Sequence, residues 1–130
     1  MTDFARLMSD YFVKYLAGQK GSGSNTMKTY RDTFVQLLEF MDEKKHIRAD
    51  CIEVDSFSYD IINEFLEYLE KEKRVSISTR NNRLAAIRSF FKYTGYHEPK
   101  YLNISTSIRE ISKKKTEGRQ MNYLSVNAME

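Results

Sequence analysis

The chain has 130 residues, of which 41% are hydrophobic and 30% charged, a balance typical of one folded domain rather than of a disordered chain. With one proline, five glycines, no basic-then-apolar leader and no long apolar run, the composition favours an all-α protein that is neither secreted nor membrane-spanning. The single cysteine, Cys51, excludes an internal disulfide and a cysteine-built metal centre. We therefore expect a cytoplasmic protein without a cofactor, a membrane partner or a small-molecule substrate.

The formal net charge of +3 conceals a strong segregation of charge along the chain. Residues 39–72 hold eleven acidic residues against four lysines or arginines, whereas residues 73–119 hold twelve lysines or arginines against three acidic residues. A compact domain built from such halves is expected to have an acidic side and a basic side. The basic side suits a polyanionic partner such as nucleic acid.

The first segment predicts a helix from about Asp3 to Ala17, because its large apolar residues recur at helical spacing. The glycine-rich stretch 18–24 that follows is typical of a flexible connector. It lacks the Gly-Lys-Ser/Thr ending of a phosphate-binding P-loop. The residues expected to face the core are Phe4, Met8, Tyr11, Phe12, Tyr15 and Leu16.

A second helix is predicted from a cap at Ser24 or Asn25 to about Asp42. Its first turns are mainly basic and hydroxyl-bearing, and its acidic residues gather near the end, an order opposite to the one that the helix dipole prefers. Cations at a helix start are favourable when that end meets phosphate. The expected core stripe is Met27, Tyr30, Phe34, Leu37, Leu38 and Met41, and the early polar positions are Thr26, Lys28, Thr29 and Arg31.

A third helix is predicted to open at Ser58, a suitable N-cap, with Phe57 and Ile62 spaced as a hydrophobic staple. Its outer face is acidic, so we expect it to lie away from any nucleic acid. A solvated face is the favoured interpretation over paired catalytic carboxylates or metal ligands, since no histidine or aspartate partner joins the glutamates. These glutamates are Glu64, Glu67, Glu70 and Glu72.

The stretch 76–96 predicts a fourth helix with two different faces, ending near Gly95. Leu84, Ile87 and Phe91 form an apolar stripe at helical period, while the other face is basic and amide-bearing and contains no acid. Short side chains among long cations allow close approach to another surface, and these donors suit phosphates and base edges. An ordinary solvated face explains this helix alone equally well. The second face comprises Ser78, Asn81, Asn82, Ala85, Arg88, Ser89 and Lys92.

The remainder predicts a last helix within 101–111 that closes the bundle, because apolar residues recur there at helical spacing. A basic linker containing Gly118 and Arg119 follows, and it extends the basic side of the domain. Its lysine run consists of Lys113, Lys114 and Lys115.

The order of these parts resembles that of a known family. The stretch Asn25–Tyr30, with Phe34, Leu37 and Phe40 after it, resembles the second helix of the core-binding domain of phage-integrase-type tyrosine recombinases. The stretch Ser78–Tyr93 resembles the fourth helix of that domain, and residues 122–130 resemble the start of the catalytic domain of those enzymes. The resemblance covers essentially residues 1–118.

The resemblance implies a SAM-like orthogonal bundle of four to five helices that forms half of a C-shaped clamp around duplex DNA at a recombination site. It also implies nucleoid association and contacts with other recombinase protomers in a synaptic complex. Arg80 and Arg83 lie on the apolar flank of the fourth helix, so DNA reaches them only if the helix start projects beyond the core. The residues that the resemblance implies for DNA contact are Thr26, Lys28, Thr29, Arg31, Ser78, Thr79, Arg80, Asn82, Arg83 and Arg88; the helix face adds Asn81, Ser89 and Lys92, and the linker adds Lys113, Lys114 and Lys115.

The catalytic residues of that family are not recognisable here. The family uses two arginines, a His-x-x-Arg motif and a tyrosine nucleophile, whereas neither His46 nor His97 has an arginine at the required spacing. We therefore expect a core-binding domain over 1–118, and over 119–130 a linker with the truncated start of a catalytic domain. The expected function is DNA binding without strand cleavage, within a parent recombinase. The first alternative is a helical protein–protein interaction module without DNA binding. A second is a small standalone DNA-binding regulator, which is less favoured because the tail resembles the start of a severed domain.

Overall fold

The computed structural model describes residues 2–19 and 24–115 as an all-helical bundle, and no strand occurs in these ranges. The predicted tail 119–130 lies outside the described residues and stays a prediction. Of the predicted connector 18–24, residues 18–19 belong to the helix η1 and residue 24 belongs to α2, so the connector is shorter than predicted; its other residues lie outside the described ranges. The helices are α1 (Asp3–Asp10), the π-helix η1 (Tyr11–Gln19), α2 (Ser24–Lys45), the 3-10 turns η2 (Ala49–Cys51) and η3 (Val54–Ser56), α3 (Tyr59–Lys71), α4 (Ile77–His97), η4 (Pro99–Tyr101) and α5 (Leu102–Arg109).

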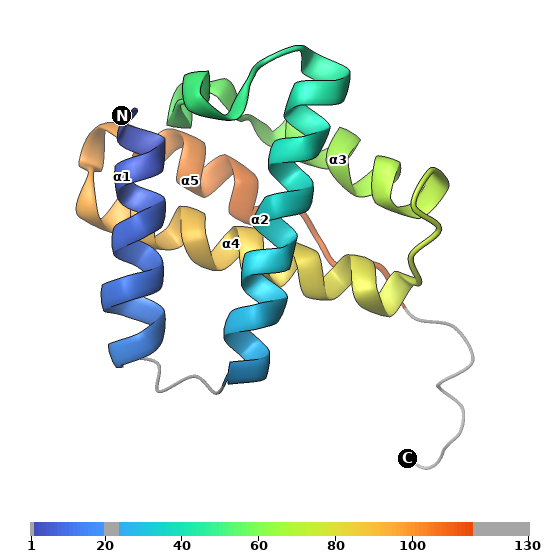
Figure 1. Cartoon of the computed structure of the whole chain (residues 1–130), viewed down its shortest axis with the longest axis horizontal. Coiled ribbons are helices and arrows are strands. Elements are labelled where there is room, and N and C mark those ends of the chain that lie inside the picture. The colour runs from blue at the N-terminus through green and yellow to red at the C-terminus, as the bar shows by residue number, and fades with distance from the viewer. Residues whose placement is uncertain (1, 20–23, 116–130) are drawn as a thin grey trace.

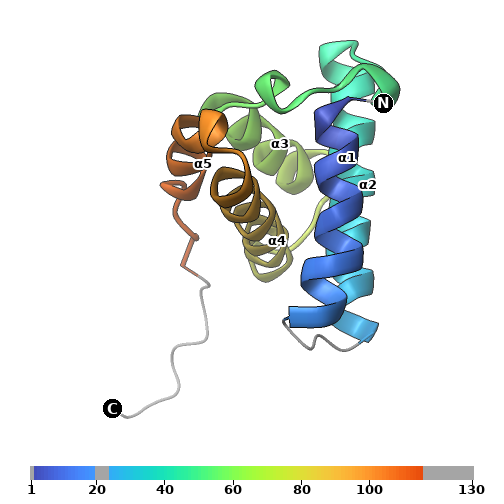
Figure 2. The same cartoon turned by 90° about the vertical axis from the view of Figure 1, so that its left-hand side faces the viewer.

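The axes of α1 and α2 run in similar directions and cross that of α4 (Figure 1). In Figures 1 and 2, α1 and α2 lie side by side and cross α4 steeply, while α3 and α5 pack on other sides of α4. The end of η1 and the start of α2 extend past α4 on one flank, and the chain after α5 descends on the other flank (Figure 2). This arrangement confirms the predicted all-α fold class and gives α4 a central position.

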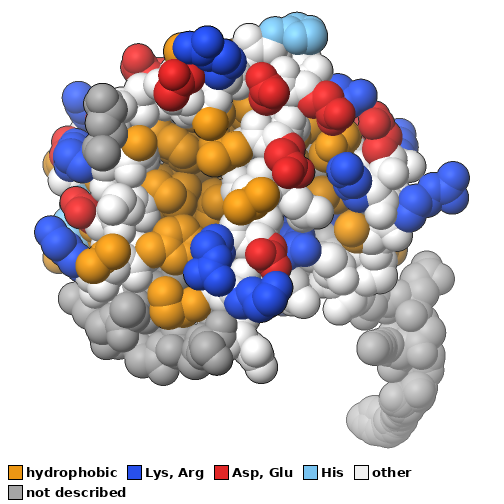
Figure 3. All heavy atoms as spheres, viewed as in Figure 1, with side chains coloured by type: hydrophobic (Ala, Val, Ile, Leu, Met, Phe, Trp, Pro, Cys, Tyr) orange, Lys and Arg blue, Asp and Glu red, His pale blue; other side chains and the backbone are white. Residues whose placement is uncertain are grey.

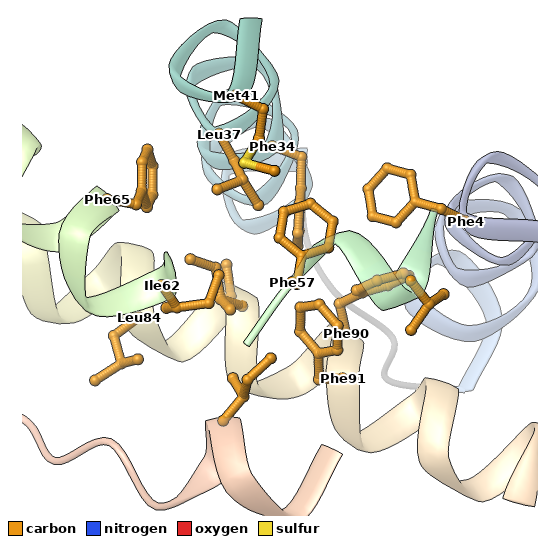
Figure 4. Close-up of a cluster of buried hydrophobic side chains, with 14 of the residues drawn as sticks. Phe4, Phe34, Leu37, Met41, Phe57, Ile62, Phe65, Leu84, Phe90 and Phe91 are labelled. Carbon is orange, nitrogen blue, oxygen red and sulfur yellow. The ribbon is translucent and has the colours of Figure 1, made fainter. Parts of the chain in front are cut away.

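Phe90 of α4 lies at the centre of the hydrophobic core and is fully buried. Its ring lies 5.6 Å from that of Phe4, 5.5 Å from that of Tyr11 and 5.4 Å from that of Phe34, in edge-to-face arrangements. These partners come from α1, η1 and α2, so one α4 side chain connects three elements, and Figure 4 shows Phe4 and Phe34 converging on it. The predicted stripe of Leu84, Ile87 and Phe91 is buried in the same core.

Two serines begin the helices that follow loops, as capping rules predict. The Ser58 hydroxyl accepts from the backbone N–H of Ile61 at the start of α3, and the Ser76 hydroxyl accepts from that of Thr79 at the start of α4. Phe57 and Ile62, the predicted staple, are both buried. The Ser76 cap therefore fixes the residue at which α4 begins.

The second helix differs from the prediction at both ends. It begins at Ser24, so neither Ser24 nor Asn25 is a cap outside it, and it continues past Asp42 to Lys45. Its last turn therefore contains Lys44 and Lys45, which favour a helix C-terminus. The first turn has no acid, as predicted, and the predicted acids Glu39, Asp42 and Glu43 do lie near the end of the helix, where Lys44 and Lys45 join them.

Gly95 does not end α4, which continues to His97. It is instead a buried point of close approach between α4 and α5, because a Cβ atom built there would lie 2.7 Å from both Cβ and Oγ of Ser105. The sequence signal was misread for a physical reason: a glycine near a helix end serves equally well as a terminator or as a packing gap.

Gly95→Ala is expected to lower the free energy of unfolding by about 1–2 kcal/mol. Overpacking costs about 1–3 kcal/mol, and the better helix propensity of alanine offsets up to about 1 kcal/mol of that. Urea unfolding of Gly95→Ala, Ser105→Gly and the double variant measures the coupling between the two positions. The double variant should lose less than the sum of the single losses; strict additivity would contradict the close contact.

The face formed by α1 and α2 carries mixed side chains. Figure 3 shows apolar side chains there, interspersed with both acidic and basic ones. Val13 of η1 and Val35 of α2 are exposed. None of the helices in the described ranges is long and apolar enough to cross a membrane.

Candidate nucleic-acid interface

The basic face of α4 borders a hollow of about 450 Å³. Arg88 and Lys92 of α4 line it together with Arg109 of α5 and Lys113 of the segment after α5. Tyr15 and Tyr30 supply the opposite wall from η1 and α2, and no acidic residue is among the lining side chains. The hollow therefore gathers four cations from three parts of the chain.

Two further hollows continue this one along α4. Towards the start of α4, Tyr30 and Ala85 are shared with a hollow of about 280 Å³ that Thr26, Thr29 and Asn82 also line. Towards the end of α4, Tyr15, Lys92 and Arg109 are shared with one of about 690 Å³. We name the three together the α4 groove; its remaining lining residues are Asn25, Leu84, Ser89, Tyr93, Gly95, Tyr96, His97, Pro99 and Leu102.

The electrostatics of the α4 groove favour an anion. None of its lining residues is an aspartate or glutamate. Four cations around one hollow repel each other, and a bound polyanion relieves that repulsion. From Asn82 to Tyr96 the groove follows about 21 Å of α4, close to the length of about six base pairs of duplex. The arrangement can hold phosphates in a row.

Several of the sequence-predicted contact residues line this groove with free polar groups. Thr26, Asn82 and Lys92 are exposed lining residues, and Arg88 is a half-buried one. Lys113 lines the central hollow from the other side. Within the described ranges, no hydrogen bond or ion pair to another side chain engages these polar groups. Arg31, Ser78 and Lys115 are also exposed.

Other predicted residues use their polar groups in contacts with other residues of the chain, either on the surface or in the interior. The Lys28 ammonium hydrogen-bonds Asp32 at 3.0 Å, which lowers the pKa of that carboxyl. The Ser89 hydroxyl shares a 2.7 Å hydrogen bond with the phenol of buried Tyr11, although Ser89 also lines the groove. The Thr79 hydroxyl accepts a hydrogen bond from Ser76 at the cap of α4.

Arg83 connects the two helices that were predicted to face DNA. Its Nη1 donates to the backbone carbonyl of Thr29 at 3.2 Å and to the hydroxyl of Thr33 at 3.3 Å. Thr33 is fully buried and itself donates to the Thr29 carbonyl. The guanidinium therefore sets the position of the start of α2 against α4, and the side chain of Thr29 lines the groove between them.

Arg80, Asn81 and Lys114 form a separate cluster at the start of α4. Arg80 is only 5% exposed, and its Nε lies 3.5 Å from the Glu70 carboxylate of α3. The condition for its exposure, a helix start that projects beyond the core, is therefore not met. Asn81 hydrogen-bonds the backbone of Lys114, whose ammonium reaches Glu70 at 3.0 Å.

Sequence reasoning did not identify Arg109, Tyr15 and Tyr30 as part of this surface. Arg109 belongs to the basic half of the chain, which was the only indication in the sequence that it could bind an anion. Its helix was predicted only to complete the bundle. The two tyrosines were assigned to the core by their helical spacing; both are half-buried, with one side against the core and another on the groove.

The acidic side of the molecule is partly neutralised by its own cations. Lys44 pairs with Glu72 at 3.1 Å, and Lys45 pairs with Glu64. Glu67 is exposed on the same helix. The outer face of α3 is thus acidic and solvated as predicted, except that Glu70 turns towards α4. No cluster of histidine, cysteine and acidic residues in the described ranges is suited to holding a metal ion.

The tyrosines with altered acidity lie in unreactive environments. Burial raises the pKa of Tyr11 above its ordinary value. Burial and a hydrogen bond to Glu43 raise the pKa of Tyr68 to about 12, and a hydrogen bond to Asp3 raises that of Tyr101. A nucleophilic tyrosine needs the opposite change, which stabilises the phenolate.

Comparison with known proteins identifies the family. Residues 10–100 match the model of the phage integrase N-terminal SAM-like domain. The chain belongs to this family. The match covers the described elements from the end of α1 to η4, including α2 and α4, so the SAM-like assignment of the bundle is confirmed.

Relatives of this SAM-like domain include named recombinases. The integrase/recombinase proteins y4rC and y4rD of Sinorhizobium fredii are 30% and 32% identical over 120 and 107 residues, which are 92% and 82% of this chain. Tyrosine recombinase XerC of Herpetosiphon aurantiacus is 36% identical over 84 residues, 65% of this chain. The chain spans 36%, 38% and 26% of the lengths of these relatives. No solved structure matches it.

Proposed function

We propose that this chain is the DNA-binding domain of a tyrosine recombinase and that it clamps duplex DNA at a recombination site through the α4 groove. The observation that carries the proposal is the central hollow, where Arg88, Lys92, Arg109 and Lys113 converge without an acidic neighbour. Lysine and arginine contacts to phosphate supply most of the affinity of such interfaces. Relatives of this chain are named integrase/recombinase and tyrosine recombinase, which supports DNA as the partner proposed here.

The proposed contacts divide by chemistry. The cations of the central hollow bind phosphates and hold the domain on the duplex, together with the exposed Arg31 and Lys115. Asn82 and Ser78 present exposed amide and hydroxyl groups that suit base edges. Few base contacts against many phosphate contacts imply binding that tolerates sequence. Arg80, Arg83, Asn81 and Lys114 act by shaping this surface rather than by contacting DNA.

In this proposal, strand cleavage belongs to another part of the parent protein. The parent performs site-specific strand exchange with other recombinase protomers, and it is nucleoid-associated while bound. This chain contributes affinity and orientation and does not cleave. The raised pKa values of Tyr11 and Tyr101 support a non-nucleophilic role for those residues.

The test is a salt titration of duplex binding by the chain. Binding should be measurable at low ionic strength, and log K should fall with log salt with a slope of about −0.9 for each phosphate neutralised, so about −3.6 for the four central cations alone. Fluorescence anisotropy with a labelled mixed-sequence duplex gives this slope. Binding that is undetectable at low salt, or independent of salt, overturns the proposal. Sedimentation without DNA checks the alternative, since concentration-dependent self-association would favour a protein–protein module.

A further inference from the structure

The segment after α5 is fastened across the start of α4 by side chains from two helices. Asn81 donates from Nδ2 to the Lys114 carbonyl at 2.8 Å and accepts from the Lys114 N–H at 3.0 Å. Its amide therefore pairs with both backbone groups of one residue, as a neighbouring strand would in a sheet. An amide side chain has the donor and the acceptor that this double contact needs.

A buried charge reinforces the fastening. Arg80 donates to the Ser112 carbonyl at 3.2 Å and to the Asn81 amide oxygen at 3.0 Å. The Glu70 carboxylate lies against the Arg80 guanidinium and also accepts from the Lys114 ammonium. Since a buried guanidinium is stable only with partners, Arg80 holds Glu70 and the 112–114 backbone in one network.

These contacts determine which surface each of two consecutive lysine side chains faces. Ile111 is buried in the core and anchors the segment at one end. Lys114 turns towards Glu70 on α3, whereas Lys113 lines the central hollow of the α4 groove with Arg88. The side chains of Lys113 and Lys114 thus point to different parts of the surface, and holding the backbone of residue 114 also limits where the side chain of residue 113 can lie.

We propose that Asn81, Arg80 and Glu70 are positioning residues that hold the segment 111–115 in place, so that Lys113 completes the cationic hollow and the chain leaves the domain in a fixed direction beside bound DNA. The part of this proposal that concerns DNA binding by Lys113 rests on the proposed function. It gives Asn81, Arg80 and Lys114 a role in fixing the segment that carries Lys113, in place of direct contact with DNA.

Amide hydrogen exchange of the full chain without DNA tests the fastening itself. The Lys114 amide should exchange slowly in the unaltered chain and at least about tenfold faster in Asn81→Ala, because about 1.4 kcal/mol of lost hydrogen bonding corresponds to a factor of ten. Asn103→Ala, which alters an exposed asparagine of α5, is the matched control and should leave the Lys114 amide unchanged. Fast exchange in the unaltered chain, or unchanged exchange in Asn81→Ala, overturns the proposal.

A double-mutant cycle with duplex DNA tests the positioning of Lys113. Lys113→Ala should weaken binding about fivefold to tenfold near 0.1 M salt and make the salt slope shallower by about 0.9, but should have little further effect in Asn81→Ala. Lys114→Pro removes the backbone N–H that donates to Asn81, at a position outside any helix. This variant should behave as Asn81→Ala does. Equal losses from Lys113→Ala in both backgrounds overturn the positioning role. Absence of all DNA binding instead overturns the proposed function. The hydrogen-exchange experiment then still tests whether Asn81 holds the backbone of Lys114.

Discussion

Replacing Arg88 and Lys92 together with alanine is expected to weaken duplex binding about fiftyfold near 0.1 M salt and to make the salt slope shallower by about 1.8. Both cations line the central hollow, and no acidic residue lines it to share their charge. Anisotropy titrations at several salt concentrations measure the affinity and the slope together. The helix content should stay unchanged, because Lys92 is exposed and Arg88 only half-buried.

Controls on α3 separate a local contact from a general charge effect. Lys71→Ala removes one exposed cation from the acidic helix, so it is the matched control for Lys92→Ala. We expect Lys71→Ala, and also Glu64→Ala with Glu67→Ala, to change the affinity much less than Lys92→Ala does, because α3 lies away from the proposed DNA path. Equal losses from variants on both helices would mean that the DNA-facing surface is misplaced.

Phe90→Ala is expected to lower the free energy of unfolding by about 4 kcal/mol, a large part of the 5–15 kcal/mol that holds a typical domain together. The ring is fully buried and contacts aromatic rings from α1, η1 and α2, so its removal leaves a cavity where three elements meet. Urea or thermal unfolding followed by circular dichroism measures the loss.

Tyr96→Ala is the matched control for that variant, because it removes an aromatic ring from the same helix at a position that is 82% exposed. Its free energy of unfolding should change by less than about 0.5 kcal/mol. A small loss from Phe90→Ala, or a similar loss from Tyr96→Ala, would contradict the buried position of Phe90. Any DNA binding by Phe90→Ala should be measured well below its unfolding midpoint.

Helical periodicity predicted the helices well because burial follows the spacing of apolar residues. Leu84, Ile87 and Phe91 recur on one face of α4, and all three are buried. The capping serine Ser58 was also predicted, since a hydroxyl before a periodic run has a local role that needs no tertiary contact. Gly95 was misread because its role depends on Ser105, which belongs to another helix.

The candidate surface was predictable in part. Arg88 and Lys92 were predicted from the face that they share, because helix geometry alone places residues four apart side by side. Arg109 was missed, since its place beside them depends on how α5 packs against α4. Asn81 was placed on the basic face by its helical position, and Arg80 was proposed from the family resemblance although it lies on the apolar flank. The polar groups of both residues turn inward, to Lys114 and Ser112.

The amino-acid sequence by itself determined the all-α class, the order of the helices, the family and the basic character of one half of the chain, because these follow from residue type and short-range spacing. Only the tertiary structure decided which cations share a hollow and which are used internally. Lys113 and Lys114 are adjacent and chemically identical, yet one lines the α4 groove and the other pairs with Glu70. The difference arises from long-range contacts with α3 and α4, which no local pattern in residues 111–115 encodes.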